Sequence, residues 1–160
     1  MMGAMDAPRD AQGFLTAESV RGLFDRAVAH WNARRFFEAH EDWETLWNDA
    51  EGRYREWLQG LIQFAAGFHH FQRGGSGGFA RLMKTASDKA AGYTGDTQGV
   101  DFCGLWAELR PWVAHGERVS HGEDLRHGAP AALPTIEYQP GFVPVPFPPE
   151  PDSEDAEDEA

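Results

Sequence analysis

The chain has 160 residues and a mass of 17.8 kDa, a size typical of a single domain. Its 14 Lys and Arg residues stand against 26 Asp and Glu residues, and the formal net charge of −12 argues against a nucleic-acid-binding protein. The single cysteine, Cys103, excludes an internal disulfide and a thiolate zinc cage. No apolar run approaches the roughly 20 residues of a membrane span, and the N-terminus has no apolar signal-peptide core. We therefore expect a cytoplasmic protein that does not bind membranes.

Apolar residues recur at helical spacing in five segments, which short turn-forming stretches separate. The expected helices span residues 16–33, 35–49, 53–72, 78–92 and 101–116. Thr16 is the expected N-cap of the first helix, and Pro111 is expected to kink or break the last one. The glycine-rich residues 73–78 are interpreted as a helix C-cap followed by a flexible linker. Because short connections favour antiparallel neighbours, the predicted fold class is all-α, a compact bundle of about five helices.

The C-terminal part of the chain differs in composition from the helical part. Residues 127–160 contain eight of the ten prolines, eight acidic residues and no Lys or Arg. Since proline cannot continue a helix or a central strand, this part is expected to be an extended, Pro-rich, acidic tail with a disordered end. The predicted organisation is a helical domain over residues 14–118 and a Pro-rich segment and tail over residues 119–160. A tail of this composition is also a candidate docking segment for a partner.

The second expected helix carries ionisable residues within an aromatic face. On a wheel of about 100° per residue, His40 and Glu44 lie within about 40° of each other, with Glu41 at the edge of the face. Three other polar residues are expected to point away from it: Glu38, Asp42 and Thr45. Because burying an unpaired carboxylate is costly, Glu44 is predicted to be paired with His40 itself, with a polar group of another helix or with a metal ion.

The third expected helix offers such polar groups. Gln59, Gln63 and His70 fall within about 60° of one another, and Gly60 and Gly67 beside them allow another helix to approach closely. The rest of this helix is mostly apolar, so it is predicted to lie at the centre of the bundle. Packing the two polar stripes together would form one internal pocket. Its expected residues are His40, Glu41, Glu44, Gln59, Gln63 and His70.

Three interpretations of this pocket are open from the residues alone. The side chains can form a buried hydrogen-bond network that fixes the helix register. They can also form a metal-free pocket that binds a ligand. In the third interpretation the protein is a metal-dependent hydrolase. His40, Glu44 and His70 would then bind zinc, iron or manganese, and Glu41 would act as the base on bound water.

Two motifs resemble the signature of the DUF309 family. They are NARRFFEAHEDWETLW at residues 32–47 and WLQGLIQFAAGFHHFQRG at residues 57–74, followed by GFARL at residues 78–82. The resemblance covers roughly residues 20–92 and implies a small all-helical domain. Some members of the family carry the label "predicted metal-dependent hydrolase". The motifs imply these site residues: Glu38, His40, Glu41, Glu44, Gln59, Gln63 and His70.

Two departures from the family pattern fall in turns. The family often has glycine where Ala33 stands and asparagine where Gly75 stands. The Pro-rich acidic tail lies outside the resemblance. The tryptophans are expected in the core, although Trp31 and Trp112 are also candidates for a homodimer interface.

Overall fold

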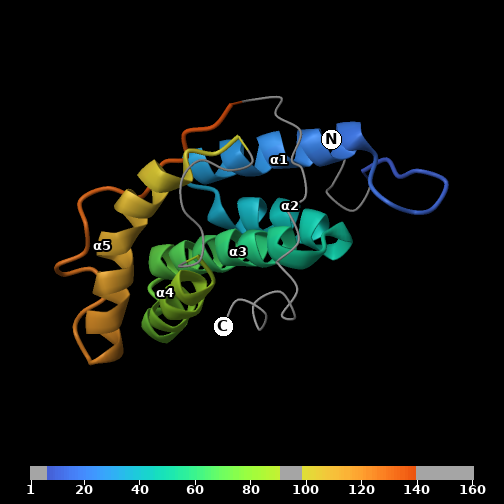
Figure 1. The fold of residues 1–160 in the computed structure, drawn as a ribbon. Coiled ribbons are helices and arrows are strands. Elements are labelled where there is room, and N and C mark those ends of the chain that lie inside the picture. Colours follow the sequence, from blue (N-terminus) through green and yellow to red (C-terminus); the bar gives the residue numbers. More distant parts are fainter. Residues whose placement is uncertain (1–6, 91–98, 140–160) are drawn as a thin grey trace, which may run out of the picture.

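The computed structural model describes residues 7–90 and 99–139, and this part of the chain contains five α-helices and no β-strand. The predicted all-α bundle is therefore confirmed, while residues 140–160 of the predicted tail lie outside the described residues. The helices are α1 (Ala17–Asn32), α2 (Phe36–Asp49), α3 (Gly52–Arg73), α4 (Ser76–Ala90) and α5 (Phe102–Ser120). Figure 1 shows α1, α2 and α3 stacked roughly parallel to one another, with α5 crossing one end of the stack. No helix among the described residues is long and apolar enough to cross a membrane.

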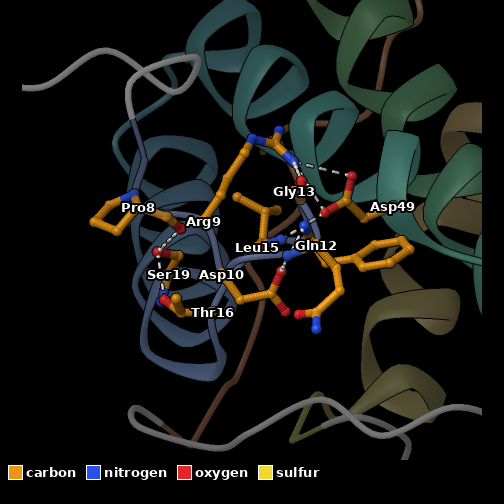
Figure 2. Close-up of polar contacts among 10 residues, drawn as sticks. Pro8, Arg9, Asp10, Gln12, Gly13, Leu15, Thr16, Ser19 and Asp49 are labelled. Carbon is orange, nitrogen blue, oxygen red and sulfur yellow. Dashed lines mark hydrogen bonds and ion pairs between the residues drawn. The ribbon is translucent and has the colours of Figure 1, made fainter.

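Helix α1 begins at the predicted cap. The Thr16 side chain accepts a hydrogen bond from the Ser19 amide at 3.1 Å, which satisfies one of the free N–H groups of the first turn. The residues before it form a tight loop, shown in Figure 2, which is fastened to the end of α2. Asp49 accepts hydrogen bonds there from the Leu15 amide at 2.8 Å and from the Arg9 guanidinium at 3.2 Å. The loop thereby joins the start of α1 to the end of α2.

The centre of the bundle is aromatic. Trp31, Phe36 and Phe68 are fully buried and meet edge to face or tilted, with ring centroids 5.1–5.5 Å apart. Trp112 of α5 extends this cluster with a T-shaped contact to Phe68 at 5.2 Å. Trp31 and Trp112 are 0% and 2% exposed, so both lie in the core as expected, and neither is available for the homodimer interface for which they were alternative candidates. The homodimer itself stays a prediction.

Helix α3 packs its glycines against α4. A Cβ at Gly67 would lie 2.4 Å from the Met83 Cε atom, and one at Gly60 would lie 3.7 Å from the Lys89 Cβ atom. The predicted close approach of another helix is therefore observed. The neighbour on this side is α4, however, and not α2, which carries His40. Because the two glycines place no side chain between α3 and α4, these two helices lie close together.

The linker between α3 and α4 is shorter than predicted for the glycine-rich residues 73–78. Gly74 caps α3 in the left-handed conformation with φ of 82°, but Ser76 already begins α4. The prediction of a flexible linker as far as residue 78 was wrong. Gly78 is helical, and a Cβ there would lie 2.7 Å from Nδ1 of His70. Glycine is needed at this position because the imidazole lies against the first turn of α4.

Pro111 was expected to kink or break the last helix. It does not end the helix, because α5 continues to Ser120. Pro111 is exposed. The carbonyl four residues earlier, which loses its amide partner, can therefore be hydrated on the solvent side. The buried residues of α5 on either side of the proline, Leu109 and Trp112, keep the helix against the bundle.

The chain after α5 returns along the bundle to the end of α1, as the orange segment of Figure 1 shows. We call residues 132–139 the strap. Asn32 binds the backbone of Ile136 twice, since its Nδ2 donates to the Ile136 carbonyl at 2.9 Å and its Oδ1 accepts from the Ile136 amide at 2.8 Å. Ile136 is 2% exposed and Pro134 is also buried. The contacts of the bundle thus extend to Gln139, while the predicted boundary at residue 118 stays a prediction.

Candidate functional site

The buried face of α2 differs from the expected one. Its buried residues are Phe36, Ala39, Asp42, Trp43, Thr45 and Leu46. This face is centred near Ala39, one residue before His40, which is a rotation of about 100°. The aromatic Phe37 is 49% exposed, whereas Asp42 and Thr45, expected to point away, are 3% and 8% exposed.

A charge pair with α1 explains why the face is rotated. The Arg26 guanidinium donates two hydrogen bonds to Asp42, from Nε at 2.9 Å and from Nη2 at 2.7 Å. Nε2 of His30 lies 3.7 Å from the same carboxylate. The hydrogen bond to Asp42 raises the pKa of Arg26, which keeps the guanidinium charged. A bidentate partner satisfies both carboxylate oxygens, so Asp42 can occupy a buried position.

His40 and Glu44 lie at the edge of the bundle. Their side chains are 25% and 52% exposed, and His40 Nε2 lies 3.4 Å from Glu44 Oε2. They contact each other as the i, i+4 spacing predicted, but Glu44 is not in the middle of a buried face. Nδ1 of His40 is buried and has no hydrogen-bond partner within the described residues.

The predicted residues of α3 lie on the outer side of that helix. Gln59, Gln63 and His70 are half-buried, and the Gln63 Oε1 atom has no hydrogen-bond partner in the described part of the chain. His70 packs beside Gly75 and Gly78, at the junction with α4. Among the described residues, no three His, Cys, Asp or Glu side chains are grouped so that they could hold a metal ion. His40 and Glu44 are therefore brought together as a pair, without a third ligand.

Glu38 and Glu41 are exposed, and Glu38 lines an open cavity of about 350 Å³ between the start of α2 and the end of α3. We call this cavity the α2–α3 pocket. It is lined by Arg34, Arg35, Phe36, Phe37, Glu38, His69, Gln72 and Arg73. Of the residues that the sequence analysis assigned to the site, Glu38 alone is among those that line this cavity.

The α2–α3 pocket carries an excess of positive charge in an acidic chain. Three arginines and one glutamate line it, and no acidic residue of the described chain lies within ion-pair distance of Arg35 or Arg73. The guanidinium of Arg34 is held by backbone carbonyls of the strap. Its Nη1 donates to Pro134 O at 2.7 Å. Within the part of the chain that the structure describes, the positive charge of Arg35 and Arg73 is therefore not compensated by an ion pair.

His69 lies beside this charge. Burial lowers the pKa of His69, and the nearby Arg73 and His70 lower it further, whereas Glu38 opposes the change. The ring of His69 lies 5.3 Å from the exposed ring of Phe37, centroid to centroid. His69 is therefore mostly neutral at pH 7 and can donate or accept a hydrogen bond at the pocket.

The turn before α2 fixes the shape of the pocket. Arg34 has a φ of 66°, a left-handed conformation that is unfavourable for a residue with a side chain. Its bonds to the strap hold it there, and the Gln72 side chain donates to the Arg34 carbonyl at 3.0 Å. Arg35, the residue before the first turn of α2, makes no side-chain capping bond. The first turn of α2 thus opens on the pocket without a side-chain cap.

The sequence analysis missed most of this pocket. Arg35, Gln72 and Arg73 were not singled out, although the first motif begins just before Arg35 and the second ends just after Arg73. His69 lies off the polar stripe that Gln59, Gln63 and His70 form on α3. The signal that could have found them was the gathering of three arginines at the ends of two adjacent motifs, within a chain that is otherwise acidic.

The comparison with protein families matches the segment that contains both sequence motifs. The DUF309 family, described as a domain of unknown function, matches residues 24–82. No curated protein sequence matches the chain. The match confirms the family resemblance inferred from the two motifs. The matched segment spans most of α1, all of α2 and α3 and the first half of α4, and it contains every residue of the α2–α3 pocket. The chain carries a DUF309 domain over residues 24–82.

Proposed function

We propose that this DUF309 domain binds a small molecule in the α2–α3 pocket. The role of its polar side chains is then ligand binding and not purely structural. The observation that carries the proposal is the cavity of about 350 Å³ whose charged side chains Arg35 and Arg73 form no ion pair with any residue that the structure describes. Its volume is within the lower range of ligand cavities, and its polar groups converge from two helices.

The placement of the polar residues supports binding over a purely structural role. A structural cluster is sealed and fully hydrogen-bonded. Here Glu38, Gln72 and Arg73 are exposed, and His69 is half-buried. Gln72 is bound to the Arg34 carbonyl, but no side-chain hydrogen bond is formed by Arg73 or His69 within the described residues, so both are available to a ligand.

The test is a fragment titration of the full chain followed through histidine ring signals in NMR. We expect some small-molecule fragments to shift the signals of His69, which a His69→Gln variant assigns. His121 is the matched control, because it is exposed on α5 and paired with Glu117 at 3.1 Å. If no fragment in a diverse set moves the His69 signals, the proposal of a binding site is wrong.

The metal-dependent hydrolase has less support. It is favoured by the contact of His40 with Glu44, which are suitable ligands, but the described residues supply no third ligand, so we derive no reaction step from it. His70 as third ligand and Glu41 as base stay predictions. Elemental mass spectrometry of tag-free protein tests them. A near-stoichiometric metal that is lost in His40→Ala and Glu44→Ala would support the hydrolase, and protein that takes up no zinc, iron or manganese would refute it.

A further inference from the structure

We infer that the ligand of the α2–α3 pocket is a small organic anion, in which a phosphate or carboxylate group is joined to a compact apolar group. The inference rests on the binding function proposed above and adds the chemical class of the ligand. It is drawn from the charge, the helix geometry and the exposed aromatic ring at the pocket.

The unpaired arginines favour an anionic ligand. Arg35, the residue before α2, and Arg73, the last residue of α3, line one cavity, and neither forms an ion pair with a described residue. A guanidinium presents a planar fork of donors that matches the oxygens of a carboxylate or phosphate. Because no carboxylate of residues 7–90 and 99–139 forms an ion pair with these two arginines, an added anion is favoured beside them.

The first turn of α2 adds backbone donors to the same place. The opening N–H groups of a helix have no acceptor within the helix, and the partial positive charge of the helix dipole lies there. No side chain caps α2, and Arg35, Phe36, Phe37 and Glu38 at this end of the helix all line the cavity. An oxyanion between Arg35 and Arg73 would therefore also face helix amides.

Phe37 explains why the ligand should have an apolar part. Its side chain is 49% exposed, and among the described residues Phe14 is the other large hydrophobic side chain with comparable exposure. The ring stacks against His40 at 6.1 Å and lies 5.3 Å from His69, centroid to centroid, so these neighbours restrict its position. An aromatic ring held in this way beside two arginines provides an apolar surface for a ligand whose charged end is bound by the guanidinium groups.

The size and the remaining charge define the class further. A cavity of about 350 Å³ suits a compact molecule and not a polymer, and the net charge of −12 would repel a nucleic acid. Glu38 is the one acidic residue of the pocket. Because its carboxylate repels an anion, it limits the affinity, and removal of its charge should have the opposite effect to removal of an arginine.

The test is isothermal titration calorimetry of the full chain with four probes at one ionic strength: phenyl phosphate, benzoate, inorganic phosphate and benzyl alcohol. We expect the two aromatic anions to bind more tightly than inorganic phosphate, and benzyl alcohol not to bind. Comparison of phenyl phosphate with benzoate identifies the charged group. Binding by the anions should weaken as salt is added, because the interaction is largely electrostatic.

Three variants decide the role of the charges. Arg73→Gln should weaken the binding of the preferred anion by about tenfold or more, and Glu38→Gln should strengthen it. Arg81→Gln on the exposed side of α4 is the matched control and should change nothing. Circular dichroism melting of each variant verifies that it is folded, since Arg73 also lies in the last turn of α3.

The outcomes separate the ligand class from the binding function. If benzyl alcohol binds as tightly as the anions and Arg73→Gln has no effect, the anion inference is wrong while the binding function stands. If phenyl phosphate and benzoate both fail to bind at concentrations of about 1 mM, the anion inference is also wrong. The NMR titration of His69 then decides whether the pocket binds anything at all.

Discussion

The ionisable residues on the two sides of α2 differ in their burial and in their pairing. On the side that faces α1, Asp42 is buried and both its oxygens accept hydrogen bonds from Arg26. On the side that borders α3, the His40–Glu44 pair is partly exposed, and no described acidic residue forms an ion pair with Arg35 or Arg73. The first side uses charge to fix the packing of two helices. The second leaves charge available to solvent and to ligands.

This difference shows why buried and functional polar groups should not be equated. A buried charge persists where the protein itself supplies the partner, and its loss is then felt as a loss of stability. A half-exposed group without a partner adds little to stability and can be used for binding. The variants below test the contrast, beginning with the one expected to have the largest effect.

Asp42→Ala should have the largest effect on folding. It removes the bidentate partner of a guanidinium at the α1–α2 interface, and we expect a loss of about 3 kcal/mol in the free energy of unfolding, measured in urea. Glu44→Ala is the control on the opposite side of the helix and should lose less than about 1 kcal/mol. Equal losses in the two variants would remove the contrast between the sides of α2.

The strap offers the next largest effect. Asn32→Ala removes two hydrogen bonds to the Ile136 backbone and should lower the free energy of unfolding by about 1–3 kcal/mol. Asn48→Ala, at an exposed position of α2, is the matched control. If Asn32→Ala were as stable as Asn48→Ala, the strap would not contribute to the stability of the bundle.

His40→Ala distinguishes the structural network from an accessible pair. A buried network predicts a loss of about 1–3 kcal/mol, because Glu44 would lose its partner in the interior. Since Glu44 is 52% exposed and can be hydrated, we expect a loss of less than about 1 kcal/mol. A larger loss, seen in urea unfolding without metal, would restore the structural interpretation.

The smallest effect concerns pH. Because the folded-state pKa of His69 is below its usual value of 6.5, the unfolded chain binds more protons between these two values. The contribution of His69 to stability should therefore fall as the pH drops below about 6.5. Burial is the largest cause of the lowered pKa of His69, and the ionisable groups around it are Arg73 and His70 on α3 and Glu38 and His40 on α2.

His69→Gln isolates this contribution from the other titrating groups. Urea unfolding between pH 5 and pH 8 should show a slightly weaker decline toward acid in the variant than in the wild type. A steeper decline in the variant would mean that protonated His69 is favoured in the folded state.

The sequence was sufficient for the helices because each has a strong apolar period and clear end signals. Thr16 capped α1 as predicted, and Gly74 ended α3. The predicted orientation of α2 was wrong because the apolar Phe37 is exposed and the charged Asp42 is buried. The rotation of the helix depends on Arg26, which belongs to a different helix. Such pairs cannot be deduced from the wheel of one helix.

The same limit applies to the site. His40 and Glu44 were predicted together because both belong to one helix and four residues separate them. The α2–α3 pocket joins the start of one helix to the end of another, so its composition depends on tertiary packing. The strap was also outside the reach of helical periodicity, because its contacts use backbone groups of an extended segment more than 90 residues away from Asn32 and Arg34.

The most direct test of the account is the free energy of unfolding of the wild type and of an Arg35→Gln/Arg73→Gln variant, each measured with and without phenyl phosphate. Without ligand, we expect the two proteins to agree within about 1 kcal/mol, because these arginines form no ion pair among residues 7–90 and 99–139. With phenyl phosphate at about ten times its dissociation constant, the wild type alone should gain about 1.4 kcal/mol. A large loss of stability in the variant without ligand, together with no gain by the wild type on adding phenyl phosphate, would show that the arginines are structural and would contradict the account.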